Sequence, residues 1–170
     1  MSYPHRINQL KEVERELRKQ DWFSKDWKIL IELWPNENQP SCAMFQLFKK
    51  GWFNEDTCGI HIETWLTDHP IDQQKIPVLM HVLHKKTFPG GQDADAVSKP
   101  LVEDPDVKMM VKGWKGYKLG KGGMTPFRAN KGFTEDNVVL GLIQEFGKTQ
   151  EIGDYVDQYL GRLPTTKKTN

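Results

Sequence analysis

The sequence has few cysteines and no long apolar stretch. Only two of its 170 residues are cysteine, which is too few for a disulfide framework. No stretch approaches the roughly 18 apolar residues that a membrane span requires. Residues 1–6 lead directly into a charged pattern, without the apolar core of a signal peptide. We therefore expect a soluble, cytoplasmic protein that has no membrane partner.

The sequence also lacks a net charge and the common catalytic motifs. Its 24 lysines and arginines nearly balance 23 aspartates and glutamates, so no global field favours nucleic acid or an acidic partner. No G-x-S-x-G elbow, phosphate-binding P-loop, C-x-x-C or H-x-x-x-H spacing occurs. Function therefore has to be inferred from the surfaces that the predicted fold creates.

Length and apolar patterning predict one α+β domain. A chain of 170 residues fits a single compact unit, which we place at residues 1–163, followed by a flexible tail at 164–170. Residues 4–20 carry apolar side chains at helical spacing, which predicts an N-terminal surface helix. Four segments of alternating apolar and polar residues follow and predict an antiparallel meander of strands. These segments are residues 27–34, 42–53, 59–66 and 76–85.

Strand register supports the meander. A four-residue turn that opposes Phe53 to Cys58 places the apolar residues of the second and third strands on one face, including Phe45 and Ile62. The same alternation brings the apolar residues of the first and fourth strands to that face. We therefore predict a four- to five-stranded antiparallel sheet whose apolar face is covered by C-terminal helices.

The region after the meander has a different character. Residues 86–133 are rich in glycine and lysine and weakly periodic, so we predict a long irregular segment there. Within it, residues 106–111 indicate a short helix and residues 114–119 a candidate fifth strand. Thr134 is predicted to be a helix N-cap. The apolar stripe that continues to Leu163 predicts one kinked helix or a helix pair.

The second face of the sheet mixes aromatic residues with a few ionisable ones. Such a mixture suits the wall of a ligand pocket, because apolar atoms supply affinity and sparse polar atoms supply orientation. It also fits a face that is simply covered by long lysine and glutamate side chains or by residues 86–133. Our first interpretation is a binding domain that uses this face for an unknown small ligand or protein partner. The predicted ligand-binding residues are Trp34, Trp52, His61, Glu63, Trp65 and His81.

Three residues of that face suggest a metal-dependent enzyme as an alternative. If the connection after the third strand aligns Leu66 with Ile76, His61 lies directly opposite His81 and Glu63 shares their face. Two imidazoles and a carboxylate can bind a divalent metal ion with coordination positions left open. The plain alternative is a pair of strand histidines without any cofactor.

A basic segment suggests nucleic acid as another alternative partner. Residues 107–133 interleave lysines with aromatic residues and contain no acidic residue, a pattern that can grip single-stranded nucleic acid. The backbone amides of Gly120 to Gly123 could form an anion nest. The plain alternative is a solvated loop. The predicted nucleic-acid-binding residues are Lys112, Trp114, Lys115, Tyr117, Lys118, Lys121 and Arg128.

Overall fold

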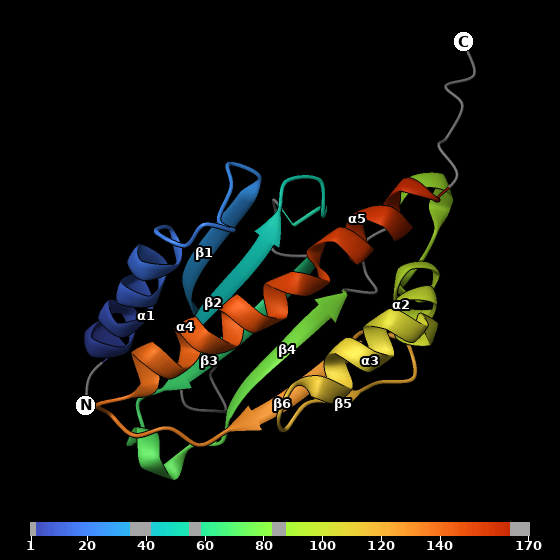
Figure 1. Ribbon diagram of the computed structural model, residues 1–170. Coiled ribbons are helices and arrows are strands. Elements are labelled where there is room, and N and C mark those ends of the chain that lie inside the picture. Colours follow the sequence, from blue (N-terminus) through green and yellow to red (C-terminus); the bar gives the residue numbers. More distant parts are fainter. Residues whose placement is uncertain (1–2, 35–41, 55–58, 83–87, 164–170) are drawn as a thin grey trace.

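A six-stranded sheet forms the centre of the protein. The computed structural model describes residues 3–34, 42–54, 59–82 and 88–163 (Figure 1). The strands run in the order β1-β2-β3-β4-β6-β5, and every neighbouring pair is antiparallel. This confirms the predicted α+β class, with more strands than predicted. The strands are β1 (Trp27–Trp34), β2 (Cys42–Lys49), β3 (Ile60–Thr67), β4 (Ile76–Val82), β5 (Lys118–Leu119) and β6 (Phe127–Lys131).

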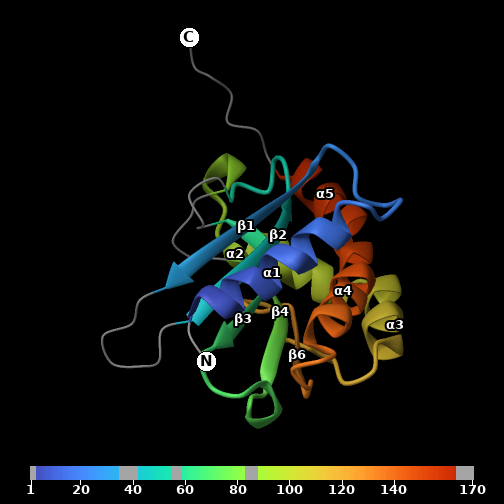
Figure 2. The ribbon, with the colours of Figure 1, turned by 90° about the vertical axis from the view of Figure 1, so that its left-hand side faces the viewer.

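Helices cover one side of this sheet. They are α1 (Tyr3–Leu17), α2 (Ala94–Glu103), α3 (Pro105–Gly113), α4 (Val138–Thr149) and α5 (Gly153–Gly161), with 3₁₀ turns at Ile71–Gln73, Pro89–Gly91 and Gln150–Ile152. In Figure 1, α4 and α5 run across the front of the strands, and Figure 2 shows both helices to one side of the sheet. In the part of the chain that the structure describes, no helix has both the length and the apolar character to cross a membrane.

The apolar faces of the strands point the same way, as the alternation predicts. Phe45, Ile62 and Met80 are fully buried in one core. The ring of Phe45 lies 4.7 Å from the ring of Phe146 on α4. Burial of each such side chain is worth roughly 1.5–3 kcal/mol relative to exposure. The helices are therefore held on the sheet by a continuous apolar layer. The opposite face of the sheet takes no part in this packing.

The β2–β3 pairing differs from the predicted register by two residues. Leu47 lies opposite Ile62, whereas the predicted four-residue turn would place it two residues further along β3. The reason is that the chain bends after β2 through positive φ angles at Gly51 (93°) and Phe53 (58°), which a simple tight turn does not include. A two-residue shift preserves the alternation of side chains, so the predicted faces are unchanged. Residues 55–58 of the predicted turn lie outside the described residues.

The segment predicted to be irregular contains regular elements in its described part, so that prediction is wrong there. Asp93 caps α2 by accepting hydrogen bonds from two backbone N–H groups of its first turn, and Asp104 caps α3 in the same way. The predicted fifth strand shortens to β5, and β6 inserts between β4 and β5. These elements leave little periodicity to detect in the sequence. The helices are short and begin at single aspartate caps, and the strands have only two and five residues.

The predicted C-terminal helix pair is confirmed, but its start is not. Asn137 rather than Thr134 occupies the N-cap position of α4. The side-chain Oδ1 of Asn137 instead accepts a hydrogen bond from the backbone N–H of Thr134 at 2.8 Å, which closes the turn ahead of the helix. The predicted tail at 164–170 and residues 83–85 of the predicted fourth strand lie outside the described residues.

Candidate metal centre

The second face of the sheet is more buried than an ordinary solvent-facing sheet surface. Met44, Gln46 and Leu79 point to this face, and each is buried. His61 and Glu63 are buried among them. A buried histidine and a buried glutamate need polar partners, because an unpaired charge or donor in such surroundings is costly. The partners of these two residues therefore define what the face can do.

Strand pairing places the two histidines side by side. In the β3–β4 register, His61 is the direct partner of His81, and Glu63 is the partner of Leu79, which matches the alignment predicted from the sequence. The two imidazole rings lie 5.5 Å apart, centroid to centroid, at an interplanar angle of 71°. Direct cross-strand partners on one face have close Cβ atoms, so β3 and β4 bring the two rings together.

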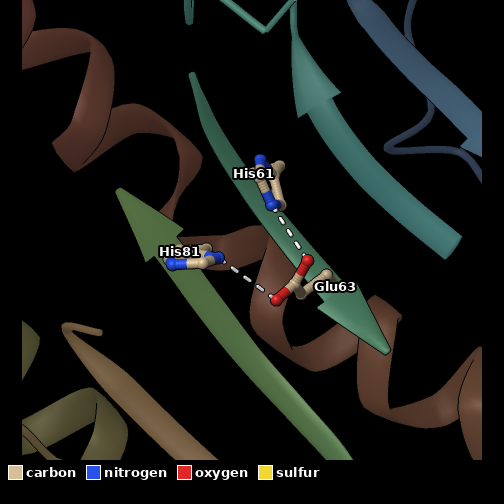
Figure 3. Close-up of side chains that lie close together, drawn as sticks. All are labelled: His61, Glu63 and His81. Atoms are coloured by element: carbon tan, nitrogen blue, oxygen red, sulfur yellow. Dashed lines mark hydrogen bonds and ion pairs between the residues drawn. The ribbon is translucent and has the colours of Figure 1, made fainter. Parts of the chain in front are cut away.

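Glu63 joins both histidines into one cluster. Its Oε2 lies 3.0 Å from Nε2 of His61, and its Oε1 lies 3.3 Å from Nδ1 of His81 (Figure 3). One ligand atom from each of the three residues lies within 4.8 Å of the others. Among the described residues, this is the one such group of three metal-ligating side chains. In Figure 3 the C-terminal helices lie behind the strands, on the other side of the sheet from these side chains.

A second layer of side chains fixes the orientation of the His61 ring. Nδ1 of His61 lies 2.7 Å from Oδ1 of Asn54, and that oxygen also accepts a hydrogen bond from the backbone N–H of Gly59 at 3.0 Å. The Asn54 amide nitrogen donates to Oε1 of Gln46 at 2.9 Å. Because a backbone N–H contacts Oδ1 of Asn54, that atom is an acceptor. Nδ1 of His61 must therefore carry a proton and donate it to Asn54.

Position 59 has no room for a side chain, so it requires glycine. A Cβ atom added to Gly59 would overlap the carbonyl group of Phe53, and Phe53 immediately precedes Asn54. The chain crosses itself here without room for a side chain, which holds the Asn54 amide against β3. A larger residue at position 59 would displace the backbone that carries Asn54. The close crossing thereby fixes the tautomer of His61 through its asparagine partner.

The fixed tautomer of His61 places two hydrogen-bond acceptors against each other. With the proton on Nδ1, a neutral His61 presents a lone pair at Nε2. Nε2 faces the Oε2 atom of Glu63 at 3.0 Å, which is also an acceptor when the carboxylate is ionised. The amide nitrogen of Gln46, 3.3 Å from Nε2, fits Nε2 as an acceptor. Two acceptors at 3.0 Å need a shared proton or a bound cation between them.

The carboxylate of this cluster is ionised when the imidazoles beside it are charged. Burial by itself raises the pKa of Glu63, but hydrogen bonds and charges from the imidazolium forms of His61 and His81 outweigh burial and hold that pKa at about 2. Glu63 therefore needs a positive charge beside it in its mostly buried position, either an imidazolium or a bound cation. Because His81 is the most exposed member, with 25% of its side chain exposed, solvent or a ligand can reach the cluster beside it.

The three tryptophans predicted to bind a ligand do not surround this cluster. Trp34 is 60% exposed at the end of the edge strand β1, and Trp65 is half-buried opposite Met44. Trp52 is buried in the core on the helix side, with its ring 5.6 Å from the ring of Trp27. Its placement on the second face is wrong because β2 ends at Lys49, before the alternation reaches Trp52.

The basic segment does not provide stacking platforms. Trp114 and Tyr117 are buried, and their rings pack edge to face against each other and against Phe127. Neither ring offers a free face to a base, so the predicted stacking role does not fit the structure. The remaining predicted residues of this set, Lys112, Lys115, Lys118, Lys121 and Arg128, are exposed.

The predicted anion nest at Gly120 to Gly123 is partly occupied by the protein itself. The backbone N–H of Gly120 donates to the carbonyl oxygen of Pro126 at 2.7 Å. The N–H of Gly123 donates to Oδ1 of Asp95 at 2.9 Å. Two of the four amides are thus committed to the fold, and the segment acts as a turn between β5 and β6.

Asn54, Gln46 and Gly59 were not predicted as functional residues. Asn54 and Gly59 lie in the irregular connection between β2 and β3, where period-two reasoning gives no side-chain direction. Gln46 carried a signal, because it is a polar residue at a position of the second face that the alternation identifies. Comparison of the chain with protein-family models, with curated proteins and with solved structures found no match.

Proposed function

We propose that the protein binds a divalent transition-metal ion through Nε2 of His61, the carboxylate of Glu63 and Nδ1 of His81. The observation that carries this proposal is the contact between Nε2 of His61 and Oε2 of Glu63, with Asn54 holding the only proton of a neutral imidazole on the other ring nitrogen. A metal ion between these acceptors would satisfy all of them. Histidine ligands in metal sites are commonly oriented in this way, with the second ring nitrogen donating to an oxygen.

The ligand set indicates which metals suit the site. Imidazole and carboxylate ligands together favour Zn²⁺ or Fe²⁺ over Mg²⁺ and Ca²⁺, which prefer sites made entirely of oxygen atoms. Three protein ligands leave at least one coordination position for water or substrate, as in catalytic rather than structural zinc sites. The partial exposure of His81 gives that position access to solvent. A metal ion held here could act as a Lewis acid or lower the pKa of a bound water.

A competing arrangement uses a proton instead of a metal. If His61 is an imidazolium, it donates from both ring nitrogens, to Asn54 and to Glu63, and the cluster is a buried ion pair with a structural role. The two arrangements make opposite predictions. A structural ion pair needs no metal, whereas a metal site gains affinity as the ligands lose their protons.

The metal proposal is tested by titrating chelator-treated protein with ZnCl₂ in a calorimeter. We expect one zinc ion per chain, and loss of that binding in His61→Ala and His81→Ala. His69→Ala is the matched control, because His69 is exposed and lies outside the cluster. Circular dichroism of His81→Ala checks that the fold is intact, since His81 is the least buried of the three. A wild-type protein that takes up no stoichiometric zinc or iron would refute the proposal.

A further inference from the structure

A basic hollow lies on the same face of the sheet as the histidine cluster. It encloses about 420 Å³ beside the β5–β6 hairpin. Strand pairing links it to the cluster in one row, because Glu63 is the partner of Leu79, Leu79 of Arg128, and Arg128 of Lys118. Direct partners point to the same face of a sheet. The residues that line the hollow are Gly116, Lys118, Leu119, Gly120, Thr125, Arg128, Ala129 and Asn130.

The two cations of this hollow are not neutralised by the protein. Among the described residues, no carboxylate lies within ion-pair distance of Lys118 or Arg128. Arg128 makes a long contact of 3.5 Å from Nη2 to Oδ1 of Asn130. Lys131 in the same hairpin behaves differently, because its ammonium group contacts Glu145 at 3.1 Å. Lys118 and Arg128 are therefore available to an anion from outside.

The hollow and the cluster are close enough to share one ligand. Arg128 lies two strands from Glu63, which is about 10 Å at the usual strand spacing. It is nearer to His81, because its partner Leu79 stands two residues from His81 on β4. Leu79 is a buried apolar residue between them. A ligand that reaches the open side of His81 would thus meet the guanidinium of Arg128 across a short apolar floor.

We propose that this face binds a small ligand with a phosphoryl group, held between the metal ion and the side chains of Arg128 and Lys118. This inference rests on the proposed metal site. Arginine recognises phosphate oxygens through two parallel hydrogen bonds, and lysine adds a point charge. A metal ion with an open position supplies a third attraction for the same dianion.

The observations favour a small ligand over a nucleic-acid strand. Lys131 is already paired, and its ammonium also donates to the carbonyl oxygen of Lys115 at 2.7 Å. The rings of Trp114, Tyr117 and Phe127 are buried, so none of these three offers a face on which a base could stack. Affinity for a strand depends on a row of several phosphate contacts, whereas the hollow offers two cations at one point.

Phenyl phosphate is a suitable probe, because it carries one phosphoryl group and chelates zinc weakly. We expect zinc-loaded protein to bind phenyl phosphate roughly tenfold or more tightly than benzoate in calorimetric titrations. Arg128→Gln combined with Lys118→Gln should abolish most of that binding and leave zinc affinity unchanged. Lys11→Gln combined with Lys25→Gln is the charge-matched control, since both lysines are exposed and neither lines the hollow. The control should bind phenyl phosphate as the wild type does.

The possible outcomes separate this inference from the metal proposal. Zinc binding without any phenyl phosphate binding, or with equal binding by the Arg128/Lys118 variant, would overturn the phosphoryl inference and leave the metal site intact. Failure of zinc binding itself would overturn both. A single-stranded oligonucleotide that binds through Arg128 and Lys118, while phenyl phosphate does not bind, would replace the small ligand with a nucleic-acid partner.

Discussion

Two of the charge clusters in the described part of the chain differ in whether their hydrogen bonds are complete. The first is formed by Arg6 on α1, which is fully buried, and Glu135 ahead of α4. The guanidinium donates to both carboxylate oxygens of Glu135 at 2.8 Å, to the carbonyl oxygens of Thr67 and His69, and to Gln9. Every contact in this arginine clamp joins a donor to an acceptor.

With a neutral His61, the histidine cluster lacks such a match. Oδ1 of Asn54 accepts the hydrogen bond from Nδ1 of His61, and Nε2 of His61 then faces a carboxylate oxygen of Glu63. A cluster that is complete in itself, such as the arginine clamp, fixes the position of helices on a sheet. A cluster that lacks one positive charge can accept it from outside the chain. The comparison teaches that the completeness of hydrogen bonding, rather than burial, distinguishes a structural ion pair from a candidate metal site.

The largest expected effect concerns the arginine clamp. Glu135→Ala leaves the guanidinium of Arg6 buried without its carboxylate, and we expect the free energy of unfolding to fall by about 3 kcal/mol. The loss should be the same with chelator and with zinc, because the clamp needs no metal. Urea unfolding measures it, with Glu103→Ala as the exposed control. A loss that depends on zinc would contradict the separation of the two clusters.

A smaller effect is expected at the second layer of the histidine cluster. Asn54→Ala removes the acceptor for the His61 Nδ1 proton, so we expect zinc affinity to fall about 10- to 100-fold. Asn54→Asp keeps an acceptor for Nδ1 of His61 but loses the donor to Oε1 of Gln46, so its zinc affinity should lie between those of the wild type and Asn54→Ala. Calorimetric titration of both variants with ZnCl₂ makes the measurement. Equal zinc affinity in Asn54→Ala and the wild type would show that the tautomer of His61 does not matter.

Sequence reasoning was most successful where side chains alternate regularly. The period of two assigned Phe45 and Ile62 to the core face, and alignment of β3 with β4 paired His61 with His81, as observed. Both inferences depend only on which alternate residues of a strand share a face. They hold as long as the connection between two strands keeps that alternation. A two-residue error in the β2–β3 register therefore changed the partners of Leu47 without changing any face.

The same reasoning failed where the backbone is irregular. Trp52 follows the end of β2, where positive φ angles reorient the chain, and its side chain lies in the core on the helix side instead of on the second face. Trp114 and Tyr117 were interpreted as exposed platforms because lysines surround them, yet their rings fill the core beside β6. The partners of these residues come from distant parts of the chain, so local spacing carries no information about them.

The smallest expected effect is the acid sensitivity of the arginine clamp. The hydrogen bonds from Arg6, which outweigh the effect of burial, lower the pKa of Glu135 from 4.5 to about 2. Because the folded protein binds the proton less readily than the unfolded chain, the clamp stabilises the fold fully above about pH 4.5 and loses that contribution as the pH falls toward 2.

The difference in unfolding free energy between the wild type and Glu135→Gln should accordingly shrink as the pH is lowered through this window. Chelator keeps the histidine cluster free of metal, and Glu63 is present in both proteins, so its own titration cancels in the difference. Glu135 is partly exposed, and solvent screening keeps the change below that of Glu135→Ala at neutral pH. A difference that stays constant from pH 5 to pH 2 would mean that Arg6 does not hold this carboxylate in its ionised form.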